Sequence, residues 1–114
     1  HRVRTFLRAE ARRIILGRIA ERAGRLPRPP TAVSVRDTRS RWGSCSSAGR
    51  LSFSWRLILA PPAVLDYVVA HELAHLSHRG HGPAFWNAVD MLCDDVAARR
   101  AWLRQHGRDL FRYG

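Results

Sequence analysis

The sequence predicts an α+β fold with an N-terminal helix, a small antiparallel sheet and helices after the sheet. Three observations support this prediction. Apolar residues recur at helical spacing over residues 3–23, alternate over residues 51–59, and recur at helical spacing again over residues 83–107. The 114 residues are enough for one compact domain with a modest core. We therefore expect a single domain over residues 1–114. Because the chain begins with His1 rather than Met, we expect it to be a fragment or to have lost its start.

The first third of the chain is predicted to form one long helix and a strand. Over residues 3–23 apolar side chains recur every three or four residues and arginines fill the other face, so we expect an amphipathic helix that Gly24 ends. A proline-rich linker at 26–30 follows, and Ala32, Val33 and Val35 then indicate a short strand. The apolar residues of the helix are Val3, Phe6, Leu7, Ala11, Ile14, Ile15, Ile19 and Ala23.

A hairpin and two more helices are predicted next. Turn-forming residues place the hairpin tip at 46–49, and the alternation from Leu51 to Leu59 indicates a half-buried strand whose edge could pair with an extended peptide. Residues 61–80 are predicted to form a helix, with prolines at its start and Gly80 at its end. Residues 83–107 are predicted to form one further helix.

Positive charge is concentrated in the first half of the chain. All 20 basic residues are arginine; residues 1–50 hold 13 of them against 3 acidic residues, whereas residues 51–114 hold 7 against 6. Such a surface attracts nucleic acid, anionic lipid or acidic protein, and it is also typical of a solvated helix face. As candidates for weak nucleic-acid contact we single out six arginines of the first helix and linker: Arg8, Arg12, Arg18, Arg22, Arg25 and Arg28.

Composition argues against a membrane protein and against a disulfide framework. No apolar run approaches the ~20 residues that span a bilayer. The chain has two cysteines, Cys45 and Cys93, which we expect to be reduced thiols in a cytoplasmic protein. Four tryptophans could stack on nucleobases, but their strand and helix spacing favours the core: Trp42, Trp55, Trp86 and Trp102.

The stretch HELAHLSHRGH, residues 71–81, has the pattern of a metal site. His71 and His75 are four residues apart in a predicted helix, so their side chains lie on one face and can reach one ion. Glu72 lies beside that face, where it could take a proton from a water bound to the metal. HExxH would arise by chance in roughly one such chain in a hundred. The alternative is a histidine-rich surface helix that holds no metal.

A catalytic zinc takes three protein ligands and keeps one position open, so a third ligand is expected. His81 follows Gly80, where the chain could leave the helix and turn back over the ion. His78 is the rival, but on a straight helix it would lie nearly two turns from His71. We therefore predict that His71, His75 and His81 hold one Zn²⁺ and that His78 contacts solvent or substrate.

Four stretches of residues 40–89 resemble one known family. RWGSC, WRLILAPP, DYVVAHELAHL and HGPAFW are similar to the YgjP-like metallopeptidases of bacteria, which are related to the SprT-like group within the zincins. The resemblance implies a zincin-like catalytic domain with metal ligands at His71, His75 and His81 and a general base at Glu72. It also implies that a β-rich N-terminal region, usual in the family, is missing here, so that we expect the chain to be the C-terminal part of a longer protein. The family does not require a histidine at position 78.

The leading functional hypothesis is a zinc-dependent endopeptidase that hydrolyses peptide bonds with a zinc-activated water and Glu72 as general base. Candidates for oxyanion or substrate contact are Arg41, Tyr67 and His78. Asp66, Asp90 and Asp94 are candidates for orienting the ligand imidazoles. Two alternatives stay open: a SprT-like protease that acts on DNA- or RNA-bound proteins, and a non-catalytic module with structural zinc. Glu72 argues against the second, because a structural site needs no base. The oligomeric state and the substrate are not predicted.

Overall fold

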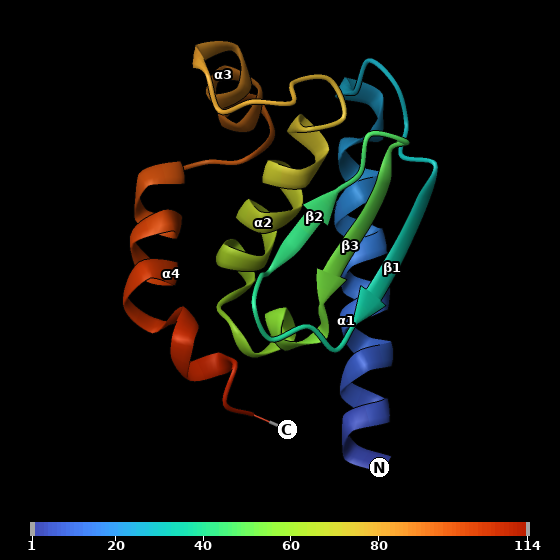
Figure 1. The fold of residues 1–114 in the computed structure, drawn as a ribbon, viewed down its shortest axis with the longest axis vertical. Coiled ribbons are helices and arrows are strands. Elements are labelled where there is room, and N and C mark those ends of the chain that lie inside the picture. Colours follow the sequence, from blue (N-terminus) through green and yellow to red (C-terminus); the bar gives the residue numbers. More distant parts are fainter. Residues whose placement is uncertain (1, 114) are drawn as a thin grey trace.

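The computed structural model describes residues 2–113 and confirms the α+β class (Figure 1). A long helix, α1 (Arg2–Arg22), precedes a sheet of three strands, β1 (Ala32–Arg36), β2 (Gly43–Cys45) and β3 (Arg50–Ser54). Three further α-helices follow: α2 (Pro62–Ala74), α3 (Pro83–Leu92) and α4 (Val96–Leu110). Two short 3₁₀ helices, η1 (Ala23–Arg25) and η2 (Trp55–Leu59), connect these elements. No helix in this part of the chain is long and apolar enough to cross a membrane.

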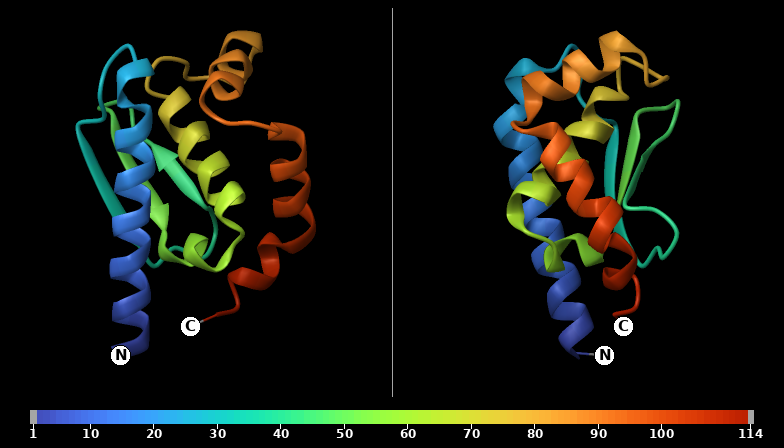
Figure 2. Two further views of the ribbon diagram at one scale, coloured as in Figure 1. Left: turned by 180° about the vertical axis from the view of Figure 1, so that it is seen from behind. Right: turned by 90° about the vertical axis from the view of Figure 1, so that its left-hand side faces the viewer.

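The helices cover one face of the sheet and leave the other face to solvent. Figure 2 shows the strands as one layer, with α1 and α2 packed against one side of it. Leu51 and Phe53 of β3 point into this interface, where they meet Ile15 of α1 and Val69 and Leu73 of α2 in one buried cluster. The core therefore lies between the sheet and the two helices, and it holds α2 against the strands.

The sheet is mixed, and the prediction of an antiparallel sheet was wrong in one pairing. β2 and β3 form the predicted antiparallel hairpin, but β1 pairs with β3 in parallel, and the order is β1-β3-β2. The reason is that residues 37–42 carry the chain past the end of β3 to the far edge, so that β3 enters between the other two strands. The predicted strand 51–59 also ends early, at Ser54, whose side chain accepts a hydrogen bond from the Arg56 amide and begins η2.

The predicted helix 61–80 ends at Ala74, before Gly80. Beyond this point the backbone carbonyl groups accept hydrogen bonds from side chains instead of from the amides of a further helical turn. Arg79 Nη1 donates to the carbonyl of His75 at 3.2 Å, and both Nε and Nη2 of Arg28 donate to the carbonyl of Leu76. Helical propensity gave no sign of this ending because the donors are arginines outside the helix.

The predicted helix 83–107 is two helices, α3 and α4, separated at residues 93–95. Here too, arginines from the first part of the chain bind the last carbonyl groups of the helix, in this case α3. Arg22 Nε donates to Leu92 O at 2.8 Å, and Arg25 Nη1 donates to Met91 O at 2.7 Å. Asp95 then adopts a left-handed conformation with φ of 47°, which short polar residues tolerate better than most. The break reorients α4 so that it packs along α2 (Figure 1).

Helix α1 buries only part of its predicted apolar face. Ala11, Ile15 and Ile19 are buried, but Val3 and Phe6 are exposed, because the first turns of the helix extend past the sheet (Figure 1). Ala23, at the end of the predicted face, is also exposed.

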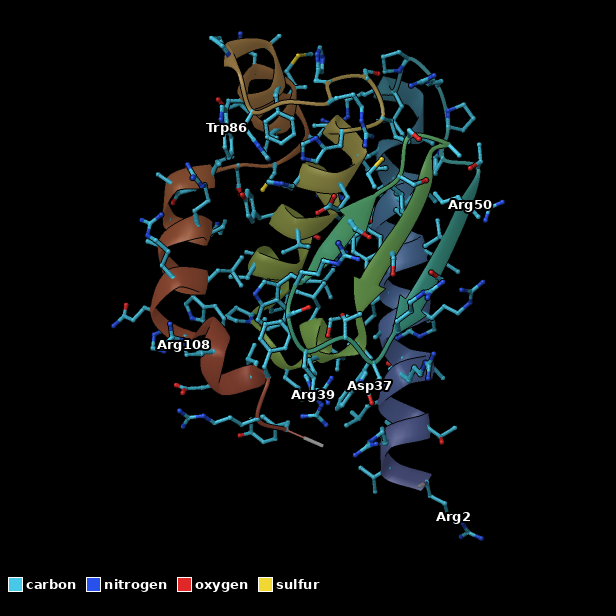
Figure 3. All side chains as sticks on the ribbon, viewed as in Figure 1. Arg2, Asp37, Arg39, Arg50, Trp86 and Arg108 are labelled. Atoms are coloured by element: carbon cyan, nitrogen blue, oxygen red, sulfur yellow. The ribbon has the colours of Figure 1, made fainter. Side chains whose placement is uncertain are left out.

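A buried arginine fixes one end of the sheet. Arg56 is fully buried, and its guanidinium donates to Asp37 Oδ1, to the carbonyl of Thr38 and to the carbonyl of Tyr113. Trp55 Nε1 donates to the same Asp37 oxygen at 3.2 Å. Asp37 lies at the lower end of the strands in Figure 3. The ion pair therefore joins the loop after β1 to the C-terminal residues.

Candidate metal centre

Three imidazoles converge where α2 ends and α3 begins. His71 lies in the last turn of α2, His75 directly follows the helix, and His81 comes from the loop before α3. Their ligand atoms all lie within 4.8 Å of one another, whereas His78 is not part of the cluster. Nitrogen ligands at about 2.0–2.1 Å from one tetrahedral zinc would be roughly 3.3 Å apart, so small ring rotations suffice to close the set on one ion. Three imidazoles suit zinc, as they also suit copper, iron and nickel.

Hydrogen bonds orient two of the three rings. His75 Nδ1 lies 2.8 Å from the carbonyl of His78. A carbonyl only accepts, so Nδ1 carries the proton and the Nε2 lone pair is free for a metal. His71 Nδ1 lies 3.1 Å from the hydroxyl of Tyr67, one turn earlier on α2. Such contacts fix the tautomer and the direction of ligand rings in metal proteins.

Phe85 packs against all three imidazoles. Its ring stacks on His75, with centroids 4.4 Å apart, and meets His71 and His81 edge-on at 5.0 Å and 4.9 Å. Phe85 is 1% exposed and lies in the first turn of α3, which Pro83 begins. It therefore forms a rigid wall that limits ring rotation. Helical spacing identified Phe85 as a core residue but gave no sign of this contact.

Burial keeps the two helical imidazoles neutral. Burial lowers the pKa of His71 to about 4, with smaller contributions from His75, His81 and Arg100. Burial likewise lowers the pKa of His75. Metal ligands must be deprotonated, so both rings are in the binding form at neutral pH.

Glu72 lies beside the histidines in a hollow of about 230 Å³ that His71, Tyr67, Trp42 and Gly43 also line. The carboxyl group is 6% exposed, and burial raises its pKa to about 7, against the opposing charges of Arg41 and Arg79. A carboxyl group with this pKa can both accept and return a proton near neutrality.

Gly43 of β2 makes room for the Glu72 side chain. A Cβ at position 43 would lie 2.9 Å from Glu72 Cγ, closer than real Cβ atoms approach, and 3.1 Å from Oε2, so the Glu72 side chain would have to shift. The glycine of RWGSC is therefore required by the carboxyl group that it faces. The sequence analysis missed this role because it predicted no strand over residues 43–45, and only a glycine inside a strand would have indicated such a close approach.

Arg79 ties the loop that carries His81 to the sheet. Besides the His75 carbonyl, its guanidinium donates to the carbonyls of Ser46 and Cys45 at 3.2 Å and 3.0 Å. Arg28 holds the neighbouring carbonyl of Leu76. The two arginines fix the path of the chain between His75 and His81, and neither was singled out for this role from the sequence.

Comparison with known families agrees with this geometry. The family described as "YgjP-like, metallopeptidase domain" matches residues 1–106. The chain belongs to the YgjP-like metallopeptidase family. Membership implies a bound metal, and the three converging imidazoles fit one. No curated protein and no solved structure matches the chain.

The three candidates for oxyanion or substrate contact lie in different surroundings in this YgjP-like domain. Tyr67 is buried and its hydroxyl contacts His71, so it is close to the metal cluster. Arg41 is exposed, and its charge reaches Glu72. His78 lies past the end of α2, not on the helix as the sequence predicted, and its ring lines a separate, mainly apolar hollow of about 270 Å³ with Leu73 and Met91.

Two of the three aspartates considered as partners of the ligand imidazoles, Asp66 and Asp94, pair with arginines. Asp66 forms ion pairs with Arg18 at 2.8 Å and Arg22 at 3.8 Å, and exposed Asp94 pairs with Arg99. Asp90 is exposed and lines a hollow with Arg22 and Arg25. The hydroxyl of Tyr67 and the carbonyl of His78 take the orienting role instead.

The six arginines singled out for nucleic-acid contact all bind within the protein. Arg8 and Arg12 donate to carbonyls of β1, at Val35 and Val33. Arg18 pairs with Asp66, and Arg22 is buried. Arg25 and Arg28 donate to the carbonyls at the ends of α3 and α2. Nucleic-acid binding by these residues stays a prediction, and their first role is to join α1 and the linker to the rest of the fold.

The tryptophans pack within the protein. Trp55 is buried, Trp42 stacks on Phe111 at 4.1 Å, and Trp86 lies under the guanidinium of Arg100 at 4.3 Å. Trp102 packs against His106. Figure 3 shows Trp86 on α3, above α4. The contacts agree with the predicted packing role.

Proposed function

We propose that this domain is a zinc-dependent endopeptidase whose metal is held by His71, His75 and His81. The observation that carries the proposal is the convergence of three imidazoles beside a buried carboxyl group that is not one of them. Three neutral ligands leave one position of a tetrahedral zinc open, as catalytic sites require. A structural site would fill all four positions and would need no carboxylate next to it.

When bound, zinc would supply its double positive charge, which lowers the pKa of its water toward ~7 and polarises a peptide carbonyl. Glu72 takes the proton of the attacking water on its carboxylate and returns it to the departing amine. The side chain is well suited to both steps because it is buried and held against Gly43, so its oxygens have little freedom to turn away. Tyr67 and Phe85 keep the His71 ring in place.

Arg41 and Tyr67 are the two candidates for stabilising negative charge on the peptide oxygen. The Tyr67 hydroxyl already contacts His71, so in this proposal it supports a ligand, and Arg41 is the better candidate for the oxyanion. Arg41 precedes Trp42 and Gly43, which line the hollow of Glu72, and it is exposed and free to move toward a substrate.

An extended substrate would pair with β2 rather than with β3. The predicted partner strand, over residues 51–59, is unsuitable, because β3 lies in the centre of the sheet with a neighbour on each side. β2 is an edge strand, and its Gly43 faces Glu72. Pairing at this edge would bring a peptide bond alongside the carboxyl group.

The test is metal content and proteolysis measured on the same preparation. We expect about one zinc per chain, cleavage of a fluorescently labelled unfolded casein, loss of cleavage after chelation, and its return when zinc is added. Cleavage that survives complete metal removal would overturn the proposal. One tightly bound zinc without any cleavage would favour a structural role for the metal.

A further inference from the structure

The outer face of the sheet carries a row of serines in register. Ser34 of β1 is opposite Ser52 of β3, which is opposite Ser44 of β2. Their strand neighbours Val35, Phe53 and Leu51 are buried against the helices, so by strand alternation the serines point to the open side. Figure 2 shows this side of the sheet uncovered. A hollow of about 580 Å³ lies over it, lined by these serines and by residues around them.

Three arginines surround the serines. Arg36 at the end of β1, Arg50 at the start of β3 and Arg41 before β2 line the same hollow, and no acidic residue does. All three are exposed, and over residues 2–113 none forms an ion pair. Arg36 Nε donates a hydrogen bond to the hydroxyl of Ser34 at 3.3 Å. Hydroxyls and unpaired guanidinium groups together form a surface suited to carboxylates. We call these six residues the basic sheet face.

The basic sheet face and the hollow of Glu72 lie on either side of one short segment. Trp42 and Gly43 line the hollow that holds Glu72 and His71, whereas the flanking residues Arg41 and Ser44 line the hollow over the sheet. A polypeptide that lay along β2 would direct alternate side chains to opposite faces of the sheet. Every second side chain would then face the basic sheet face.

We propose that the basic sheet face binds an acidic segment of the polypeptide substrate, so that the domain prefers chains with aspartate or glutamate near the cleaved bond. This inference rests on the proposed peptidase function and adds the class of substrate. The residues that line the hollow include no aromatic ring on which nucleobases could stack, which favours an acidic peptide over single-stranded nucleic acid. Three separated arginines, one associated with each strand, match carboxylates spaced along an extended chain.

Binding is tested without catalysis, in zinc-loaded protein carrying Glu72→Gln. The probes are fluorescein-labelled peptides of ten glutamates and ten glutamines and a labelled ten-nucleotide oligothymidine, followed by fluorescence anisotropy. We expect deca-glutamate to bind more tightly than deca-glutamine and oligothymidine, and its affinity to fall as salt rises. The double substitution Arg36→Glu and Arg50→Glu should weaken its binding by roughly tenfold or more.

The matched control is the double substitution Arg104→Glu and Arg108→Glu on α4, which changes the net charge equally on another surface (Figure 3). It should leave the affinity for deca-glutamate within about twofold of the parent. Equal losses of affinity for deca-glutamate in both double variants would show that only net charge matters, and this would overturn the proposal. Tighter binding of oligothymidine than of deca-glutamate would overturn it as well. Because no probe is cleaved, this result is independent of whether the domain hydrolyses peptides.

Discussion

Gly43 and Glu72 fit together so closely that a single methyl group on the glycine would collide with the carboxylate side chain. The added carbon would lie 2.9 Å from Glu72 Cγ. The two residues belong to different elements, β2 and α2, so the contact fixes the carboxyl group relative to the strand edge.

Gly43→Ala should therefore displace Glu72 and slow proteolysis by about a hundredfold, as misplacement of a catalytic group by about 1 Å can do. Zinc content should stay at the wild-type level, because Glu72 is not a ligand in this proposal. The matched control is Gly17→Ala on α1, where a Cβ meets nothing within 4 Å. That variant should keep full activity and gain up to about 1 kcal/mol of stability. Equal activity in both alanine variants would contradict the assigned role of Gly43.

Alanine substitutions should separate the four histidines of residues 71–81. His71→Ala, His75→Ala and His81→Ala should each lower zinc occupancy sharply, because each removes a converging ligand. His78→Ala should keep occupancy near wild type, because only the backbone carbonyl of His78 supports the site. Metal content after dialysis against a weak chelator measures this. Loss of zinc at 78 with retention at 81 would show that the wrong histidine has been assigned.

Arg79→Ala should weaken zinc binding by roughly tenfold, because the loop from His75 to His81 would lose its attachment to β2. With cobalt in place of zinc, the visible absorption spectrum should also change as the ligand geometry loosens. Arg104→Ala, a surface arginine on α4, is the control and should change neither quantity. An unaltered affinity and spectrum in Arg79→Ala would mean that the loop holds its path without this side chain.

Asp37→Asn should destabilise the metal-free protein by roughly 1–2 kcal/mol, because Arg56 would remain buried without its charged partner and Asp37 itself is partly exposed. The Arg56 hydrogen bond lowers the pKa of Asp37 below its usual 3.8. The carboxylate therefore stabilises the fold above about pH 4 and loses this effect as pH falls through the lowered pKa.

Urea unfolding at pH 7 and at pH 3 measures this difference, which should shrink at the lower pH. Asp109→Asn, which breaks an exposed pair with Arg112, is the control and should cost less than about 0.5 kcal/mol. A cost for Asp37→Asn no larger than this would argue that Arg56 finds enough partners in the carbonyls of Thr38 and Tyr113.

Local patterns predicted the elements well and their ends poorly. The period of apolar residues found α1, the prolines and the apolar run of residues 61–80 found α2, and turn residues found the tip of the β2–β3 hairpin. The early end of α2 and the break between α3 and α4 could not be predicted in this way. Both depend on arginines distant in sequence, Arg28 and Arg22, that reach helix carbonyls across the fold. The parallel pairing of β1 with β3 likewise depends on which strand takes the middle of the sheet.

The candidate site, like the fold, could be predicted from the sequence only in part. The spacing of His71 and His75 within HExxH predicted a shared helix face, and the turn after α2 brings His81 to them. The surroundings of the site could not be read from the sequence. Phe85 was identified only as a core residue, and two of the aspartates expected to orient imidazoles, Asp66 and Asp94, pair with arginines instead. Long-range packing decides these contacts, and no local pattern encodes them.

The measurement that tests the central claim most directly is zinc content and casein cleavage for Glu72→Gln beside His71→Ala. Glu72→Gln should hold as much zinc as the wild type and lose about two to four orders of magnitude in rate, because the glutamine keeps the shape of the side chain but cannot accept the proton. His71→Ala should lose both zinc and activity. A Glu72→Gln variant that cleaves at the wild-type rate, or that loses its zinc, would contradict the role of Glu72 as the general base of a three-histidine zinc site.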